Sequence, residues 1–529
     1  MFISERRFLG VPTCDWCWIV ALALIRFFIG FRYGLGVDEA HYALYGIHLD
    51  WSYFDHPPLV GWVQAFFLSL LGHHDWVVHL PAEIAAIVTS IQAFRLGQKL
   101  TGDAKTARWG AVALNVAFLP NGLWFMFVPD TILLILVFWL IEITMRIHDR
   151  DYQYLRDWCE FGICVGLCGL AKYTAILLLP GLAIFFLWER IYSHEFNRKD
   201  FAVGFFVAVV LAALVVSPVF YWNFIHDWLS FDYQIHHVVH AHALDFTRCL
   251  HNLAVFCGVQ IIAYSPFVIA ASVMGWCTLY TRPVGRLVLS LALPGLLFFA
   301  YSGAREAGLP HWTFYVWGLL LSAGVAAGLS SQTRRISQAM KSLVVVSGVL
   351  VAVLFFELAF HVIRYPPYRS PYNDLTGWRQ LRPTVKKMIG DWRANHVGGK
   401  DIAIGVPNWT LGSRANWYYS DLAPVYVLDD RFDQFDLWEG APPIGKDILV
   451  LEWRGFSMSP DQESRCALVR PVGSKIFFEH GIPITSVQLW WCRNYGVRDS
   501  GKGLVDQTGA PDKNTSRSAT KEATGSVKQ

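Results

Sequence analysis

Acidic, aromatic and histidine side chains gather in one stretch near the N-terminus, GVDEAHYALYGIHLDWSYFDHPPLVGW. It holds Asp38, Glu39, Asp50 and Asp55 and contains no lysine or arginine. Carboxylates without an internal counter-charge suit proton abstraction or the coordination of a metal ion. A solvated loop in which Asp38 only caps a short helix explains the same residues. The sequence leaves both interpretations open.

Three further polar residues stand beside long apolar runs: Asp130 in FVPDTILL, Lys172 in GLAKYTA and Arg305 in SGAREAGLPHW. Asp130 either caps a helix or belongs to a site. Lys172 either extends along its stem to the membrane surface or binds phosphate. Arg305 is a candidate anion ligand, since arginine binds phosphate through two parallel hydrogen bonds, and an ion pair with Glu306 is the alternative.

A histidine cluster lies in NFIHDWLSFDYQIHHVVHAHALDFTR. His236 and His240 are spaced i, i+4, so they share one face if this stretch is helical. A divalent metal ion held by these histidines is one interpretation. An interfacial surface of aromatic and histidine residues is the other.

The composition shows what must position these residues. Of 529 residues, 54% are hydrophobic and 16% charged, whereas soluble proteins carry about 25% charged residues. A membrane span needs about 20 apolar residues. We expect eleven spans, at 16–33, 76–97, 107–126, 130–147, 158–171, 173–191, 202–222, 253–279, 286–301, 311–329 and 341–363. The shorter run 57–72 predicts a helix at the membrane interface.

The same numbers exclude other classes of protein. A net charge of +3 argues against a strongly basic nucleic-acid binder. The 15% aromatic content argues against disorder of the whole chain. Ten cysteines are too few for a disulfide scaffold. The first apolar run has no cleavage site for a signal peptide, which predicts a retained first helix.

The basic residues orient the spans. With the N-terminus in the cytoplasm, the cytoplasmic segments hold 17 lysines and arginines, and the opposite short loops hold three, Lys172, Arg248 and Arg305. Basic residues favour the cytoplasmic side. We therefore expect the acidic loop and the C-terminus on the side of the membrane opposite the cytoplasm.

The chain divides into three parts. Residues 1–365 form the membrane domain, with an outer loop at 34–75. Residues 366–496 predict a small α/β domain whose buried strands are 401–406, 424–430 and 447–453. Its two cysteines, Cys466 and Cys492, are either a disulfide or free thiols. The polar tail 497–529 predicts disorder.

At these residues the sequence resembles a known family. The first-loop motif DEAHYALYGIHLDWSYFDHPPLVGW is similar to that of the C-type membrane glycosyltransferases related to dolichyl-phosphate-mannose–protein mannosyltransferases and to the bacterial lipid A aminoarabinose transferase. The stretches VPDTILL, GLAKYTAILLLPGL, GLPHW, YNDLTGWRQL and YVLDDRFDQFDLW follow in the order of that family. The resemblance covers about residues 15 to 440.

The resemblance implies an inverting transferase that uses a sugar linked to polyprenyl phosphate and acts at the outer face of the inner membrane. Asp38 would then be the general base, supported by Glu39, and Asp130 the Pro-Asp carboxylate of the family. Lys172 and Arg305 are the candidates for stabilising the departing phosphate.

One run departs from the family. Where aminoarabinose transferases carry a Tyr-Phe-Glu-Lys-Pro-like stretch, Tyr53 to Pro57 read YFDHP. Asp55 keeps the acid, which in the family contributes to a metal site, and His56 replaces the lysine that contacts donor phosphate. A phosphate contact through His56 requires a protonated imidazole or a metal ion. We expect the metal, if one binds, at Asp55, His236 and His240.

The resulting expectation is a multi-pass bacterial glycosyltransferase with an envelope glycolipid such as lipid A, a polysaccharide or a protein as acceptor. A transporter or flippase of lipid-linked sugars is the alternative. Transporters of this kind often show internal repeats and charges near mid-membrane. The sequence shows no convincing repeat, and its acids lie in loops.

Overall fold

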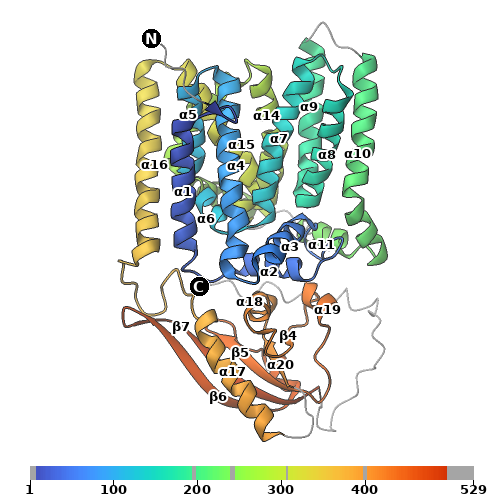
Figure 1. The fold of residues 1–529 in the computed structure, drawn as a ribbon, viewed down its shortest axis with the longest axis vertical. Coiled ribbons are helices and arrows are strands. Elements are labelled where there is room, and N and C mark those ends of the chain that lie inside the picture. Colours follow the sequence, from blue (N-terminus) through green and yellow to red (C-terminus); the bar gives the residue numbers. More distant parts are fainter. Residues whose placement is uncertain (1–6, 193–197, 239–244, 306–307, 397–401, 497–529) are drawn as a thin grey trace.

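The computed structural model describes residues 7–192, 198–238, 245–305, 308–396 and 402–496 (Figure 1). A bundle of upright helices stands above a smaller domain built around a sheet. In these ranges nine helices are long and apolar enough to cross a membrane. Seven of them are α1 (Thr13–Gly30), α4 (Asp75–Thr101), α7 (Pro129–Asp149), α10 (Arg198–Ile225), α12 (Phe246–Ala263), α14 (Pro283–Arg305) and α16 (Arg334–Phe360). The other two each begin with a 3-10 turn: Tyr173–Ile191 continues into α9 (Leu178–Tyr192), and Pro310–Ser331 continues into α15 (Phe314–Ser331).

All eleven expected spans fall on helices, but two are not continuous. The expected span 107–126 is divided into α5 (Ala104–Asn115) and α6 (Phe118–Phe125), and the span 253–279 into α12 and α13 (Pro266–Leu279). The span 158–171 is the helix α8 (Leu155–Ala171), which stands between α7 and α10 (Figure 1). The polytopic helical architecture is confirmed, and the expectation of unbroken helices at these two places is wrong.

Prolines explain both breaks. Pro120 has no N–H for the carbonyl of Val116, and Pro266 begins α13 after Ser265, whose φ is 72°. A carbonyl released inside a membrane needs another donor. The Ser347 hydroxyl of α16 donates to Val116 O at 2.6 Å and lies 2.7 Å from Ser265 Oγ. One serine therefore joins the two breaks.

The outer domain contains a five-stranded sheet in the order β4-β3-β5-β7-β6. The strands β3 (Ile402–Val406), β4 (Val425–Val427) and β5 (Asp447–Trp453) are parallel and coincide with the three predicted buried runs. A long antiparallel hairpin, β6 (Cys466–Glu479) and β7 (Ile482–Tyr495), extends the sheet and was not predicted. The small α/β domain is confirmed; residues 497–529 lie outside the described ranges.

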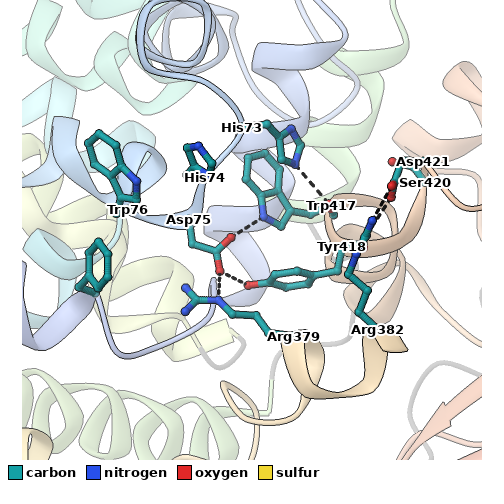
Figure 2. A pocket seen from close by; sticks show the side chains of 11 residues that line it. His73, His74, Asp75, Trp76, Arg379, Arg382, Trp417, Tyr418, Ser420 and Asp421 are labelled. Atoms are coloured by element: carbon teal, nitrogen blue, oxygen red, sulfur yellow. Dashed lines mark hydrogen bonds and ion pairs between the residues drawn. The ribbon is translucent and has the colours of Figure 1, made fainter. Parts of the chain in front are cut away.

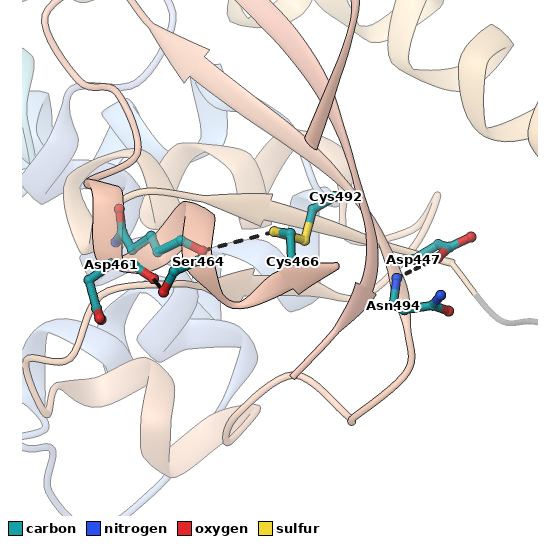
Figure 3. The surroundings of a disulfide bond; sticks show 7 residues. Asp447, Asp461, Ser464, Cys466, Cys492 and Asn494 are labelled. Carbon is teal, nitrogen blue, oxygen red and sulfur yellow. Dashed lines mark hydrogen bonds between the residues drawn. A yellow bond between two sulfur atoms is a disulfide. The ribbon is translucent and has the colours of Figure 1, made fainter. Parts of the chain in front are cut away.

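Cys466 and Cys492 form a disulfide between β6 and β7 (Figure 3). Residue 492 also pairs with Ile448 of β5. The bond ties the exposed edge of the hairpin to the strand that borders the parallel part of the sheet. Of the two states that the sequence allowed, the structure has the disulfide.

Asp75, the first residue of α4, joins the bundle to the outer domain (Figure 2). Its carboxylate accepts hydrogen bonds from Arg379 Nε at 2.6 Å, Trp417 Nε1 at 2.7 Å and the Tyr418 hydroxyl at 2.6 Å. Arg379 belongs to α17 (Trp378–Asn395), and the other two donors to α18 (Trp409–Tyr419). Three donors from two outer helices therefore meet one buried carboxylate.

We predict that Asp75→Asn loosens the outer domain, because the amide cannot accept all three bonds and leaves a cation without its partner. The expected loss is about 3 kcal/mol, read from thermal unfolding in detergent and from faster proteolysis between α16 and α17. Asp421→Asn is the control, because its pair with Arg382 is exposed and such pairs contribute less than about 1 kcal/mol. Equal shifts in both variants would contradict the prediction.

Candidate functional site

The acidic first loop folds into a short helix at the boundary between the bundle and the outer domain. This helix, α2 (Val37–Ile47), carries Asp38 and Glu39 in its first turn, where the helix dipole stabilises negatively charged side chains. Gly36 is its N-cap, and no side chain caps the helix. Ala40, Ala43 and Leu44 pack into the core of the outer domain. The helix therefore belongs to both parts of the molecule.

Asp38 and Glu39 differ in their surroundings. Asp38 is half-buried and makes no hydrogen bond or ion pair with another described residue. Glu39 is fully buried, and its Oε1 lies 2.7 Å from Nδ1 of His79 on α4. The interpretation of Asp38 as a cap is wrong for this geometry. Its carboxylate stays available to a ligand.

Asp55 is the centre of a second group of side chains. Its Oδ1 accepts from the Tyr45 hydroxyl, and its Oδ2 lies 3.1 Å from His56 Nδ1 and 3.5 Å from His41 Nε2. The other ring nitrogen of His56 lies 3.3 Å from the hydroxyl of Tyr42. Asp55 thus fixes the direction of the His56 ring.

The charges in this group act on one another. Burial opposes the ionisation of Asp55, but His41 and His56 outweigh it and hold the pKa of Asp55 well below its usual range. Burial likewise lowers the pKa of His41, but Asp55, together with the charges of Asp433 and Asp38, outweighs it, so the pKa of His41 is raised. Asp55 and His41 therefore each favour the charged form of the other.

Other segments hold this loop from outside. Ser230 Oγ of α11 (Leu229–Val238) donates to Tyr53 O at 2.6 Å, and Gln234 Nε2 of the same helix donates to Asp55 O at 2.8 Å. From the outer domain, Gln434 accepts from the Phe54 amide at 2.7 Å. Both neighbours bind backbone, so they set the path of the loop.

Asp130 and Lys172 form a buried ion pair. Lys172 Nζ lies 2.6 Å from Asp130 Oδ1, and each side chain is less than a tenth exposed. The N-cap of α7 is Val128, and Asp130 caps nothing by its side chain. Lys172 does not extend to the surface. Neither of the purely structural interpretations offered by the sequence describes these two residues.

The ion pair and the first loop approach each other. The pKa of Tyr42 is raised well above its ordinary value by burial and by the charges of three carboxylates that surround it, Asp38, Asp55 and Asp130. His311, in the turn Pro310–Thr313 before α15, lies within electrostatic range of Asp130, Lys172, Asp38 and His56. Residues from four distant segments thus converge on one place.

Lys172 lines an apolar cavity of about 930 Å³. This cavity is lined by α8, α9 and α10, which stand side by side in Figure 1, and Arg190 lies among its lining residues as well. Its apolar lining includes Phe161, Leu179 and Phe205. A mostly apolar wall that carries the cations Lys172 and Arg190 suits an amphiphile with an anionic head and a long hydrocarbon chain.

Three predicted residues are not placed in this group. Arg305 is the last residue of α14, and its role in anion binding stays a prediction. His240 lies outside the described residues, and of His236 only the backbone is described. Among the residues searched, no group of three histidines, cysteines or carboxylates is arranged to hold a metal ion, and the oxygens of Asp55 face hydrogen-bond donors instead.

Several residues of the group were missed. Tyr42 shares a helix face with Asp38 at i, i+4, so the helical spacing of the motif was a usable signal. His311 lies in the GLPHW stretch already singled out for Arg305. His79 and Gln434 carry no such signal, since their roles depend on contacts across 40 and 380 residues of sequence.

Comparisons with known proteins agree with this architecture. The family model for dolichyl-phosphate-mannose-protein mannosyltransferase matches residues 55–222. The chain is 26% identical over 305 residues to the lipid A galacturonosyltransferase RgtD of Rhizobium johnstonii, a match covering 54% of this chain and 59% of the relative. It is 24% identical to the undecaprenyl phosphate-alpha-4-amino-4-deoxy-L-arabinose arabinosyl transferase of Pseudomonas paraeruginosa, covering 71% and 67%.

Solved structures show the same fold. ArnT from Cupriavidus metallidurans bound to undecaprenyl phosphate superposes with a TM-score of 0.58 at 14% identity, covering 89% of this chain and 97% of that one. Its apo state gives 0.56 over 91% and 98%. The chain is a membrane protein with the fold of the C-type glycosyltransferases, and its predicted resemblance to the bacterial lipid A transferases is confirmed.

We predict that Asp55→Asn destabilises the protein at neutral pH by about 3 kcal/mol, because two histidines lose their counter-charge. A carboxyl with a lowered folded pKa stabilises above its unfolded pKa of about 4 and loses this contribution as the pH falls. The difference between wild type and variant in thermal unfolding should therefore shrink below about pH 4. Asp391→Asn, on an exposed position of α17, is the control; a difference that grew at low pH would refute the assignment.

Proposed function

We propose that this protein is an inverting glycosyltransferase. It moves a sugar from a polyprenyl-phosphate-linked donor to a hydroxyl of an envelope acceptor at the outer face of a bacterial inner membrane. The observation that carries the proposal is that two groups lie within electrostatic range of one residue, His311. One is Asp38, a half-buried carboxylate with no hydrogen-bond or ion-pair partner among the described residues, and the other is Lys172, a buried lysine that lines a large apolar cavity.

Each feature suits one part of the donor. The cavity takes the polyprenyl chain, and the Lys172 ammonium binds the phosphate. One of the three N–H donors of Lys172 is directed at Asp130, which holds the lysine in place and leaves the other two donors for the phosphate. His56, directed by Asp55, and Arg305 are further phosphate ligands in this proposal. The convergence of these groups near Tyr42 and His311 leaves the sugar beside Asp38.

The reaction then needs one base and one stabilised leaving group. The Asp38 carboxylate accepts the proton of the acceptor hydroxyl as the oxygen attacks the anomeric carbon. The bond from that carbon to the phosphate oxygen breaks, and polyprenyl phosphate departs with the electron pair. Lys172 stabilises the charge that grows on the phosphate. Attack opposite the leaving group inverts the configuration.

We propose an envelope glycolipid such as lipid A as the acceptor, since one relative is named a lipid A galacturonosyltransferase. The basic residues favour a cytoplasmic N-terminus, which places the acidic site and the outer domain in the periplasm. A divalent metal at His236 and His240 stays a prediction, and no step above depends on it.

A flippase of lipid-linked sugars would need the cavity but no base. A carboxylate with no partner among the described residues, Asp38, in the same neighbourhood as Lys172 favours the transferase. The two functions separate in one measurement, because a flippase moves the donor without changing the acceptor's mass.

We predict that Asp38→Asn strongly lowers the rate of transfer and leaves donor binding intact, since the amide cannot accept the proton. The expected loss of rate is about 100-fold or more. Mass spectrometry of envelope glycolipids and glycoproteins compares cells lacking the gene with cells complemented by wild type or variant. Asp227→Asn, an exposed residue in the turn between α10 and α11, is the control. A wild-type product level in Asp38→Asn removes the proposed base, and an unchanged envelope in the deletion removes the transferase.

We predict that Lys172→Ala and Arg305→Ala each weaken the binding of undecaprenyl phosphate, because each removes a cation from its phosphate. A charge-assisted hydrogen bond contributes about 1.5–3 kcal/mol, so the dissociation constant should rise at least tenfold. Lys172→Gln, which still donates to Asp130, guards against loss of the fold. Arg190→Ala tests another cation lining the same cavity and should have little effect. Unchanged affinity in both alanine variants would sink the phosphate assignment.

A further inference from the structure

Buried polar side chains continue from the acidic loop into the membrane body. His79, which contacts Glu39, lies one helical turn before Glu83 on α4. Glu83 Oε2 accepts from Nε of Arg26 on α1 at 3.1 Å. Arg26 is 1% exposed, its Nη1 donates to Asn121 Oδ1 at 3.3 Å, and its guanidinium lies 5.0 Å from the ring centre of Trp124.

These contacts show which group donates the hydrogen bond between His79 and Glu39. Nδ1 of His79 lies within hydrogen-bonding distance of two acceptors, Glu39 Oε1 at 2.7 Å and Phe125 O at 3.0 Å, so this nitrogen carries a proton and donates. The second oxygen of Glu39 has no hydrogen-bond partner among the described residues. His79 is therefore the group that holds the Glu39 carboxylate.

The pairing of the charged groups points to His79 as well. Arg26 is the ion-pair partner of Glu83, and His79 is the one side chain among the described residues that Glu39 pairs with. Unbalanced charge at membrane depth is costly. A neutral apolar side chain at position 79 would leave Glu39 buried and unpaired.

Fixing Glu39 also fixes Asp38. The two residues are neighbours in the first turn of α2, about 100° apart around its axis. Rotation of α2 is thus coupled to the direction of the Asp38 carboxylate, and this end of the helix has no side-chain cap to oppose rotation. A displacement of a catalytic group by about 1 Å can cost on the order of 100-fold in rate.

We propose that His79 is a positioning residue that holds Glu39 and thereby directs the Asp38 carboxylate toward the acceptor hydroxyl. Glu83 and Arg26 support it from within the bundle. The inference rests on the proposed function, because it assigns a task to Asp38 as base. It adds three residues of the membrane body to a site otherwise built from loops.

The test compares His79→Leu, His79→Asn and wild type, in wild-type and Asp38→Asn backgrounds. Asparagine places an N–H donor near the position of Nδ1, and leucine places none. Initial transfer rates are measured per folded enzyme by mass spectrometry, with membranes of cells lacking the gene as the source of donor and acceptor. Binding of undecaprenyl phosphate is measured on the same preparations. Thr89→Val removes a hydroxyl from a buried site on α4 that bonds only within that helix and is the matched control.

We expect His79→Leu to lower the saturating rate about 100-fold, His79→Asn to restore much of it, and undecaprenyl phosphate affinity to stay unchanged in both. In the Asp38→Asn background His79→Leu should lower the residual rate no further, since no base remains to be directed. Equal fractional losses in both backgrounds, or no rescue by asparagine, would overturn the positioning role. Full activity of Asp38→Asn alone would instead overturn the base, a separate failure of the proposed function.

Discussion

The structure depends on the cost of an unpaired charge buried inside the helical bundle. Little water reaches such a charge, so a partner from another helix neutralises it. Lys172 with Asp130, Arg26 with Glu83, and Arg286 with Glu189 meet this demand at 2.6, 3.1 and 2.7 Å. Each pair joins helices that are remote in sequence. Because the attraction weakens steeply as these partners separate, the pairs also fix how the helices stand against one another.

Polar contacts between the outer domain and the loops of the bundle also pair groups that are remote in sequence. Asp75 gathers donors from α17 and α18, and Gln434 accepts from the backbone of Phe54. Since α2 contributes to the outer core, the helix that carries Asp38 is supported from both sides. The sheet domain is therefore part of the site, although none of its strands supplies one of the converging side chains. A substitution in the core of the outer domain should therefore change the orientation of the Asp38 side chain.

Much of this architecture was predictable because it follows from local pattern. Long apolar runs located the spans, and the three buried runs located β3, β4 and β5. The hairpin β6–β7 escaped because Arg470, Pro471, Gly473 and Lys475 interrupt any alternation, and β6 is exposed over most of its length. The breaks at Val116 and Ser265 escaped because apolar runs conceal them; the prolines signal them, but Ser347, far along the chain, makes them tolerable. The candidate site divides in the same way: the motif locates Asp38, whereas His79 becomes relevant only through a long-range contact.

The presence or absence of a hydrogen-bond or ion-pair partner distinguishes the carboxylates that support the site from the one that can act as the base. Glu39, Asp50, Asp55, Asp75 and Asp130 each accept a hydrogen bond or ion pair from another segment or a neighbouring backbone group. A carboxylate engaged in this way has lost part of its capacity to accept a further proton, because its donors stabilise the charge. Asp38 alone among these acids has no such partner in the described part of the chain, yet its neighbour Glu39 is held firmly. An acid that is free to accept a proton but fixed in direction is what base catalysis requires. The arrangement of partners, more than the acidic composition of the loop, is therefore the physical reason for assigning the base to Asp38.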